Sequence, residues 1–235
     1  MNIYWMDRKK LNQTVQKMIE PTSVVLDIGC GIRPQTFQKA AVHICCEPFS
    51  QYVERLQSIV RKNKWQDRFV VIQADWEKAI KLFPPYSVDT VYLIDVIEHL
   101  EKKESLKLLK KTEMIARKQI IVFTPLGFLE QKHPDGKDAW GMDGGKMQEH
   151  RSGWEPEDFD STWNIYATEK YHKTDNMGHF YKQSHGAFFA IKNITMPKDL
   201  DKKQNKNISD RIGNFGATVS RKVKKYFIER TSDKL

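Results

Sequence analysis

The sequence predicts an α/β protein built on a doubly wound, mostly parallel sheet. Over residues 20–125, short apolar runs rich in β-branched residues alternate with segments of helical spacing, and a glycine turn or an acid follows most of these runs. The chain of 235 residues is long enough for one substantial domain, and its 40% hydrophobic content suits a packed core. No apolar run reaches the roughly 18 residues that a membrane-spanning helix needs.

The elements are expected in a regular order. Continuous apolar runs predict buried strands, and apolar residues three or four positions apart predict helices. Up to residue 125 we expect a helix over 3–19, a strand over 24–28, a short helix over 35–40, a strand over 42–46, a helix over 50–61, strands over 69–73 and 88–94, a helix over 101–116 and a strand over 119–123.

After residue 125 the rhythm changes. Residues 126–150 hold five of the twelve glycines and little apolar periodicity, which predicts a long loop near the ligand site. A short helix over 155–159 and two more strands, over 165–172 and 187–193, are expected to complete a domain of residues 1–197.

Residues 198–235 form a basic tail. They carry eleven Lys or Arg and five Asp or Glu, and so account for six of the nine net positive charges. Apolar side chains three or four apart over 208–227 predict a basic amphipathic helix, weakened by two glycines. Three roles stay open for residues 205–235: docking on the domain, peripheral contact with an anionic membrane surface, and binding of a polyanion such as RNA.

The cysteines indicate a reducing compartment. Cys30, Cys45 and Cys46 are an odd, clustered set that suits no disulfide framework, and the N-terminus lacks the apolar stretch of a secretory signal. We therefore expect a cytoplasmic protein, with the inner membrane surface as the place for any peripheral contact. No Cys-x-x-Cys or His-x-x-x-His pair is present, and no metal is expected.

Acids at successive strand ends indicate what the sheet binds. Strand 24–28 contains Asp27 and leads into Gly29-Cys30-Gly31, and Glu47, Asp75 and Asp95 follow the next three strands. Ligands of doubly wound sheets bind at the carboxyl ends of the strands. A pyrophosphate prefers a bare helix N-terminus and glycines, whereas four acids favour a ligand with hydroxyls, an amine and a positive charge.

The segments D-I-G-C-G, C-E-P, Q-A-D-W and V-D-T-V-Y-L-I-D-V-I-E-H-L resemble those of the class I S-adenosylmethionine-dependent methyltransferases, most closely the type 11-like subgroup acting on small molecules. The resemblance covers residues 20–125. It implies a Rossmann-like methyltransferase fold, with a seven-stranded sheet whose last strand is antiparallel, and S-adenosyl-L-methionine as cofactor. Arg33-Pro34 departs from the third glycine of many members, but this cofactor has no pyrophosphate to accommodate there.

The resemblance also implies roles for the residues at the strand ends. Gly29 and Gly31 would allow close backbone approach to the methionine part. Asp27 would hold the methionine ammonium, directly or through water, and Glu47 would accept both ribose hydroxyls. Asp75 would accept from the adenine amine.

Trp76 would pack on the adenine ring, and Asp95 would lie beside the methionine end. Simpler roles remain open for all these residues: Asp27 as a turn residue, Glu47 and Asp75 as solvated loop acids, Asp95 as a helix cap, and Trp76 as a cover for the core.

Two histidines are candidates for the acceptor side. A hydroxyl acceptor gains from a base near neutral pH, and His99 in I-E-H-L and His150 in E-H-R-S-G-W are placed to supply one. The alternatives are a cap or a partner of Glu98 for His99, and a loop anchor for His150. Trp154 is predicted to be a packing anchor.

The long loop suggests the acceptor. It contains Trp140 and several polar side chains, namely His133, Asp135, Asp138 and Asp143. Such groups suit O-methylation of a small or hydroxyl-rich acceptor, such as a sugar or a surface-glycan precursor. RNA or another polyanion is the alternative acceptor, and a non-catalytic cofactor-fold binding protein is the alternative class.

Other activities fit less well. Pro84-Pro85-Tyr86 precedes strand 88–94, so it does not match the DNA adenine methyltransferase motif, which follows that strand. Every cysteine lies before the position of a cytosine C5 nucleophile. Pro34 at the third-glycine position disfavours a dehydrogenase. The sequence offers no evident carboxylate cluster for a metal-dependent catechol-type enzyme, and the oligomeric state is left open.

Overall fold

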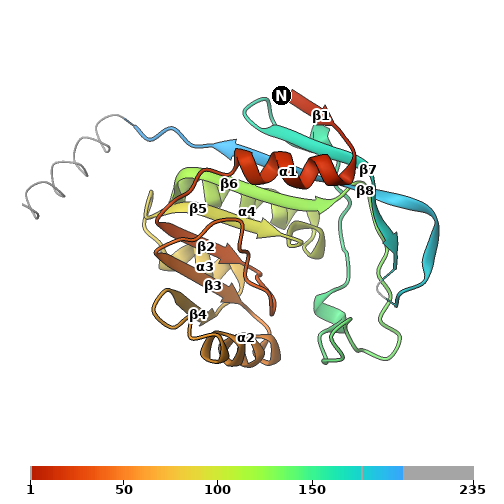
Figure 1. The fold of residues 1–235 in the computed structure, drawn as a ribbon, viewed down its shortest axis with the longest axis horizontal. Coiled ribbons are helices and arrows are strands. Elements are labelled where there is room, and N and C mark those ends of the chain that lie inside the picture. The colour runs from red at the N-terminus through yellow and green to blue at the C-terminus, as the bar shows by residue number, and fades with distance from the viewer. Residues whose placement is uncertain (1, 176, 198–235) are drawn as a thin grey trace, which may run out of the picture. The chain divides into compact units, whose positions relative to one another are not determined.

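The computed structural model describes residues 2–175 and 177–197, and residues 1–194 form one compact unit. It contains a single eight-stranded sheet with strand order β1-β7-β8-β6-β5-β2-β3-β4 (Figure 1). The predicted tail 198–235, including the amphipathic helix, lies outside the described residues.

Most of the predicted elements form close to their expected bounds. The strands are β1 (Asn2–Trp5), β2 (Val24–Ile28), β3 (Val42–Glu47), β4 (Phe69–Gln73), β5 (Val88–Ile94), β6 (Ala116–Pro125), β7 (Asn164–Thr174) and β8 (Phe180–Asn193). The helices are α1 (Arg8–Met18), α2 (Ser50–Lys62), α3 (Trp76–Leu82) and α4 (Lys102–Ile115), with 3-10 turns η1 (Ile97–His99), η2 (Gly145–Met147) and η3 (Pro156–Asp158).

The pairing of the strands gives the fold predicted from the sequence, with one strand added. Strands β2 to β6 pair in parallel, and β8 is antiparallel to both of its neighbours, β6 and β7. The eighth strand, β1, pairs in parallel with β7 at the edge of the sheet. The expectation of a helix from residue 3 was wrong at its start, because Asp7 accepts a hydrogen bond from the Lys10 amide and caps α1 there.

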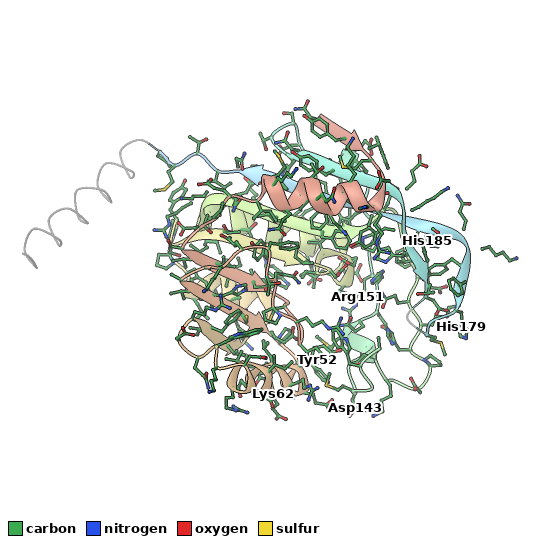
Figure 2. The ribbon with its side chains drawn as sticks, viewed as in Figure 1. Tyr52, Lys62, Asp143, Arg151, His179 and His185 are labelled. Carbon is green, nitrogen blue, oxygen red and sulfur yellow. The ribbon has the colours of Figure 1, made fainter. Side chains whose placement is uncertain are left out.

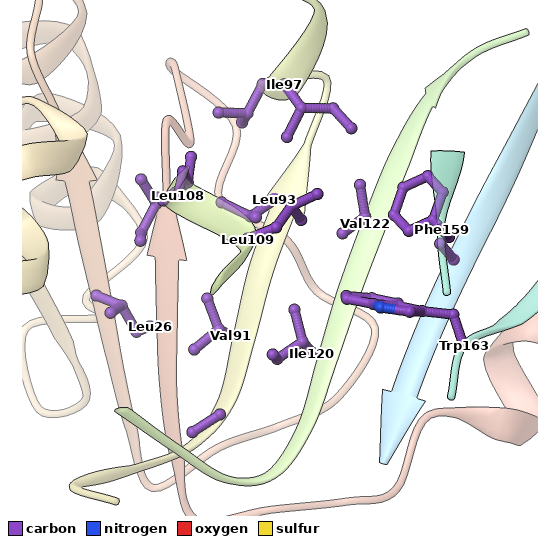
Figure 3. Packing of buried hydrophobic residues seen from close by; sticks show 14 of the residues in the cluster. Leu26, Val91, Leu93, Ile97, Leu108, Leu109, Ile120, Val122, Phe159 and Trp163 are labelled. Atoms are coloured by element: carbon purple, nitrogen blue, oxygen red, sulfur yellow. The ribbon is translucent and has the colours of Figure 1, made fainter. Parts of the chain in front are cut away.

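Helices cover both faces of the sheet. On one face α3 and α4 pack on the alternate strand residues Leu26, Val91, Leu93, Ile120 and Val122 (Figure 3). On the other face α1 packs on Val25, Tyr92 and Ile121, and α2 packs on Cys45 and Phe69. Because both faces are covered, the central strands are apolar throughout, which made their runs visible in the sequence.

Two predictions of helix content were wrong. Residues 35–40 form no helix, because the Gln38 amide turns inward and donates to Thr22, Thr90 and Tyr92 at 3.0, 3.3 and 3.2 Å. Conversely, α3 forms where no helix was expected, with Asp75 as its N-cap. None of the described helices is long and apolar enough to cross a bilayer, and the three cysteines are free and buried.

Candidate functional site

A cavity of about 620 Å³ opens at the carboxyl ends of the central strands. Its size lies within the range of ligand-binding pockets. Eight of the nine residues proposed for the site line it: Gly29, Gly31, Glu47, Asp75, Trp76, Asp95, His99 and His150. The ninth, Asp27, lies beneath the glycine turn and is not part of the cavity wall.

The glycine turn after β2 depends on the lack of side chains. Gly29 and Gly31 have φ angles of +69° and +55°, in the left-handed region that favours glycine. A Cβ on Gly29 would lie 2.9 Å from Cγ2 of Val96, and one on Gly31 would lie 3.3 Å from Cη2 of Trp140. The turn is therefore a backbone cradle between β5 and the long loop, which any larger residue would fill.

Glu47, the last residue of β3, presents a buried carboxylate to the cavity. Its Oε2 accepts from the Gly31 amide and its Oε1 from the Phe49 amide, both at 2.9 Å. Burial raises the pKa of Glu47, and the two amide donors partly oppose that shift. Each carboxylate oxygen retains a further acceptor position, so the group can still accept two ligand hydroxyls.

Asp75 and Trp76 have structural roles as well as places on the cavity wall. Asp75 Oδ1 accepts from the Lys78 amide at 2.8 Å, and this hydrogen bond lowers the pKa of Asp75. Oδ2 lies 3.3 Å from the Lys78 ammonium and faces solvent as well. Trp76 packs partly on the core, and the Lys107 ammonium lies 5.3 Å from its ring centre. Asp75 is thus a helix cap rather than the solvated loop acid of the alternative interpretation, and Trp76 covers part of the core as its alternative interpretation expected; the adenine-binding roles of both residues stay predictions.

Asp95 and Glu98 place two carboxyl groups side by side. Asp95 has a φ of +53°, a conformation that few non-glycine residues adopt, and its side chain faces the cavity. Glu98 is only 2% exposed, and its Oε2 accepts from the Thr124 hydroxyl at 3.1 Å. Burial and the neighbouring Asp95 raise the pKa of Glu98 well above its usual range, whereas Asp95 itself is exposed at the cavity surface.

Asp27 is committed to neighbouring protein groups. Its Oδ2 accepts from the Gln35 amide at 2.8 Å and lies 3.2 Å from Nε2 of His43. Its Oδ1 is buried and has no hydrogen-bond partner among the described residues. Direct contact with the methionine ammonium is therefore disfavoured by position. Of the two expected interactions between Asp27 and the methionine ammonium, contact through water is the one that fits this position.

The Asp27–His43 pair should make stability depend on pH. Burial opposes the charge on His43, but hydrogen bonds with Asp27 and Cys45 raise its pKa to about 9. A histidine in the unfolded chain has a pKa of about 6.5, so the stabilisation is complete below about pH 6.5 and is lost as the pH rises through about 9. The total is about 3 kcal/mol. We expect the difference in unfolding free energy between the unmodified chain and His43→Gln to shrink by this amount from pH 6 to pH 10 in urea titrations.

The neighbouring Cys45 thiol titrates in the opposite sense, since hydrogen bonding with Cys30 lowers its pKa. It is present in both chains, so the comparison removes the part of its contribution that does not depend on His43, which also lowers the pKa of Cys45. An equal difference at both pH values would contradict the assignment of a charged His43.

Hydrogen bonds fasten the end of the long loop to η1. The Glu98 carbonyl accepts from the amides of Arg151 and Ser152 at 2.7 and 3.1 Å, and His99 Nδ1 lies 3.1 Å from the Glu149 carbonyl. The Ser152 hydroxyl donates to the Ile97 carbonyl and accepts from Trp154 Nε1. Trp154 is 0% exposed, which confirms it as a packing anchor.

This attachment brings His150 against His99. Their ring centres lie 4.8 Å apart, edge to face, although 51 residues separate them in the chain. Burial lowers the pKa of His99 to about 4, and burial together with His99 lowers that of His150 to about 3. Both imidazoles are therefore neutral at pH 7 and weakly basic. A general-base role, for which both residues were candidates, is disfavoured.

The middle of the loop docks on α2. Asp138 is 7% exposed and accepts from the Tyr52 hydroxyl at 2.5 Å, and Asp143 bonds the side chain of Gln51 at 2.9 Å (Figure 2). Asp135 accepts from the Lys137 amide. These acids hold the loop and are absent from the residues that line the cavity, so the basis for expecting them to bind a sugar was wrong. Trp140, Gln131 and Gln148 do line it.

The family model described as "Methionine biosynthesis protein MetW" matches residues 8–134, more than half of the chain. The chain belongs to the MetW family. MetW is a family of S-adenosylmethionine-dependent methyltransferase-like proteins. The MetW match ends before Trp140, His150 and Arg151. No curated protein matches the chain.

Two solved structures, of PH0226 and YcgJ, show the same fold as this MetW member. The PH0226 protein of Pyrococcus horikoshii OT3 is 13% identical, with a TM-score of 0.51 over 80% of this chain and 89% of its own. YcgJ of Bacillus subtilis is 10% identical, with a TM-score of 0.51 over 81% of this chain and 100% of its own. Magnesium protoporphyrin IX methyltransferase of Synechocystis PCC 6803, solved with SAH, is 15% identical, with a TM-score of 0.49 over 78% and 80%.

The cavity of the MetW fold suits this cofactor. Gly29 and Gly31 leave room that a Cβ would fill, Glu47 keeps acceptor positions, and Asp27 has an unpaired buried oxygen. The cofactor supplies an activated methyl group when bound. Several cavity residues were missed, among them Arg33, noted only as a departure from the glycine pattern, and His172 of β7. Arg33 follows the glycine turn, so its position near the ligand could have been predicted from the sequence. No pattern in the sequence around His172 predicts that it lies in the cavity.

Proposed function

We propose that the chain transfers a methyl group to the hydroxyl of a small acceptor bound between His99, His150 and the long loop. One observation carries this proposal: a single cavity continues from the Glu47 end, which suits the cofactor, to the two histidines. The family match ends at residue 134, so the family's description says little about the acceptor side.

The lining of the acceptor side supports a small polar acceptor. Gln131 and Gln148 offer amides, Arg151 offers a guanidinium, and Trp140 offers a flat apolar surface. Arg151 also suits an acceptor that carries a carboxylate or phosphate. A nucleotide sugar has both hydroxyls and phosphates, so a sugar or surface-glycan precursor remains the acceptor class that we propose.

The test is incubation of the purified chain with methyl-labelled S-adenosylmethionine and a panel of nucleotide sugars, simple phenols and short RNAs. We expect label in a hydroxyl-bearing small molecule, at a position stable to mild base. Label in RNA alone would contradict the proposal. Absence of label together with absence of cofactor binding in calorimetry would contradict the assignment of the site itself.

Contact of residues 205–235 with an anionic membrane or another polyanion is a separate proposal, supported by the charge of the tail. A chain ending at residue 204 should lose sedimentation with anionic liposomes if the tail makes that contact. Equal sedimentation of the two chains would exclude it.

A further inference from the structure

Two neutral imidazoles and two carboxyl groups meet at the acceptor end of the cavity. Ligand atoms of Glu98, His99 and His150 all lie within 4.8 Å of one another. Asp95 adjoins Glu98 through its carboxyl group, and it faces the same cavity as the two histidines. Nitrogen and oxygen donors in this number and spacing are typical of a divalent transition-metal site.

The hydrogen bonds of the two histidines orient them as ligands. His99 Nδ1 lies 3.1 Å from the Glu149 carbonyl, which fixes the proton on Nδ1 and leaves Nε2 as a free donor of its lone pair. His150 hydrogen-bonds the backbone of Leu129, and its buried Nδ1 has no hydrogen-bond partner among the described residues. Backbone carbonyls behind both rings are the support that metal-binding histidines commonly have.

Glu98 gives an independent indication. It is 2% exposed, Oε2 is paired with Thr124, and Oε1 meets no donor in the described part of the chain other than the neighbouring Asp95 carboxyl. A carboxyl oxygen this deep in the protein is costly unless a cation or a proton meets it. A proton shared by Glu98 and Asp95 leaves one negative charge on the pair, whereas a divalent cation would offset the charges of both groups when they are ionised.

The second group with metal-ligand spacing in the described residues also has an unpaired buried oxygen, Asp27 Oδ1, but it differs in its access to the cavity. Asp27, His43 and Cys45 are buried together, but their charges and hydrogen bonds are directed at one another and at the Gln35 amide. That cluster has no opening to the cavity, because none of its three residues lines the wall. The cluster at η1 combines unpaired donor atoms with access to the cavity.

We infer that Glu98, His99 and His150 bind one divalent transition-metal ion at the acceptor end of the cavity, beside Asp95. An ion there would polarise an acceptor hydroxyl, so the histidines would not need to act as bases. This role in acceptor binding rests on the proposed function, whereas binding of the ion depends only on the three ligand side chains. The site lay outside our expectations because its ligands come from η1 and from the end of a loop 51 residues later.

The test is metal binding by the full chain, prepared without a polyhistidine tag and dialysed against a chelator. Zn²⁺ should bind with one ion per chain in calorimetry, and Mn²⁺ should show a bound spectrum in electron paramagnetic resonance. His99→Gln and His150→Gln should each weaken both ions by about 100-fold, since loss of even a supporting residue typically costs 10- to 100-fold. Glu98→Gln should weaken them while keeping the fold, because an amide can donate to Asp95.

His179→Gln is the matched control. His179 lies near the tip of the β7–β8 hairpin, where it is exposed and paired with Asp175 (Figure 2). This variant should bind both ions as the unmodified chain does. Sub-stoichiometric binding, or equal affinity in the His99, His150 and His179 variants, would overturn the inference.

A parallel thermal-shift titration with S-adenosylmethionine separates the two proposals. Cofactor binding without metal binding would overturn the metal site and leave the proposed function intact. Metal binding without cofactor binding would overturn the proposed function and leave the metal site intact.

Discussion

Replacing Glu47 by glutamine should weaken S-adenosylmethionine binding by about 30- to 100-fold. The carboxylate oxygens are each held by one backbone amide, of Gly31 and of Phe49, and each has room for one ligand hydroxyl. An amide would turn an N–H group toward one of those backbone donors and would offer one acceptor in place of two. The loss of charge-assisted hydrogen bonds of this kind amounts to about 2–3 kcal/mol, which corresponds to the stated change in Kd.

Calorimetric titration measures this Kd, and Glu77→Gln provides the control, because Glu77 is an acid of the neighbouring helix α3 that pairs with Lys107 and is absent from the cavity lining. Burial raises the pKa of Glu47, so its carboxylate gains a proton at a higher pH than an ordinary glutamate does. As the pH is lowered, the affinity of the unmodified chain for the cofactor should therefore begin to fall at that higher pH. The variant should lack this dependence. A Kd within threefold of the unmodified value would exclude Glu47 from the ribose site.

Replacing Trp154 by alanine should lower the free energy of unfolding by about 3–5 kcal/mol. The side chain is 0% exposed, packs against Phe159 with ring centres 5.7 Å apart, and donates from Nε1 to the Ser152 hydroxyl at 3.0 Å. The Lys102 ammonium lies 3.8 Å from the ring centre on its face. Alanine leaves a cavity, removes the donor to the Ser152 hydroxyl, and removes the ring on which the Lys102 ammonium lies.

Urea unfolding monitored by circular dichroism measures this change. Trp154→Phe should lose less, because part of the ring packing is kept, although the hydrogen bond and some of the ring volume are removed. Trp5→Ala is the control, since Trp5 is 52% exposed on the edge strand β1 and should change stability by well under the Trp154 value. A loss below about 1 kcal/mol for Trp154→Ala would show that the end of the loop is not anchored as described.

The meeting of residues at the strand ends was predictable, because the order of parallel strands places these residues at one edge of the sheet. A buried parallel strand must end at the same edge as its neighbours, so Glu47, Asp75 and Asp95 were expected to meet there, and all three line the cavity. Asp27 was the exception. It precedes the strand end by one residue and points below the turn, toward His43, a direction that the periodicity of a fully buried strand does not reveal.

The parts that were missed depend on contacts between distant segments. Residues 35–40 have helical composition, but the side chain of Gln38 donates hydrogen bonds to Thr22, Thr90 and Tyr92. These hydrogen bonds to distant strands outweigh the local helix propensity. The cluster at η1 needs the Glu98 carbonyl to bind the amides of Arg151 and Ser152, and no pattern along the chain signals that pairing. By contrast, Asp7 three residues before Lys10 was a readable N-cap signal for the true start of α1.

The short strand β1 has a consequence for how the molecule avoids sticking to itself. Strand β7 presents residues 164–167 to the outside of the sheet, and β1 covers that row of backbone groups through a parallel pairing of only four residues. An uncovered edge of this kind is a template on which a strand from another molecule can add. Residues 2–5 therefore replace part of the β7 edge by a strand of only four residues, and we expect their removal to lower solubility before it affects the cavity.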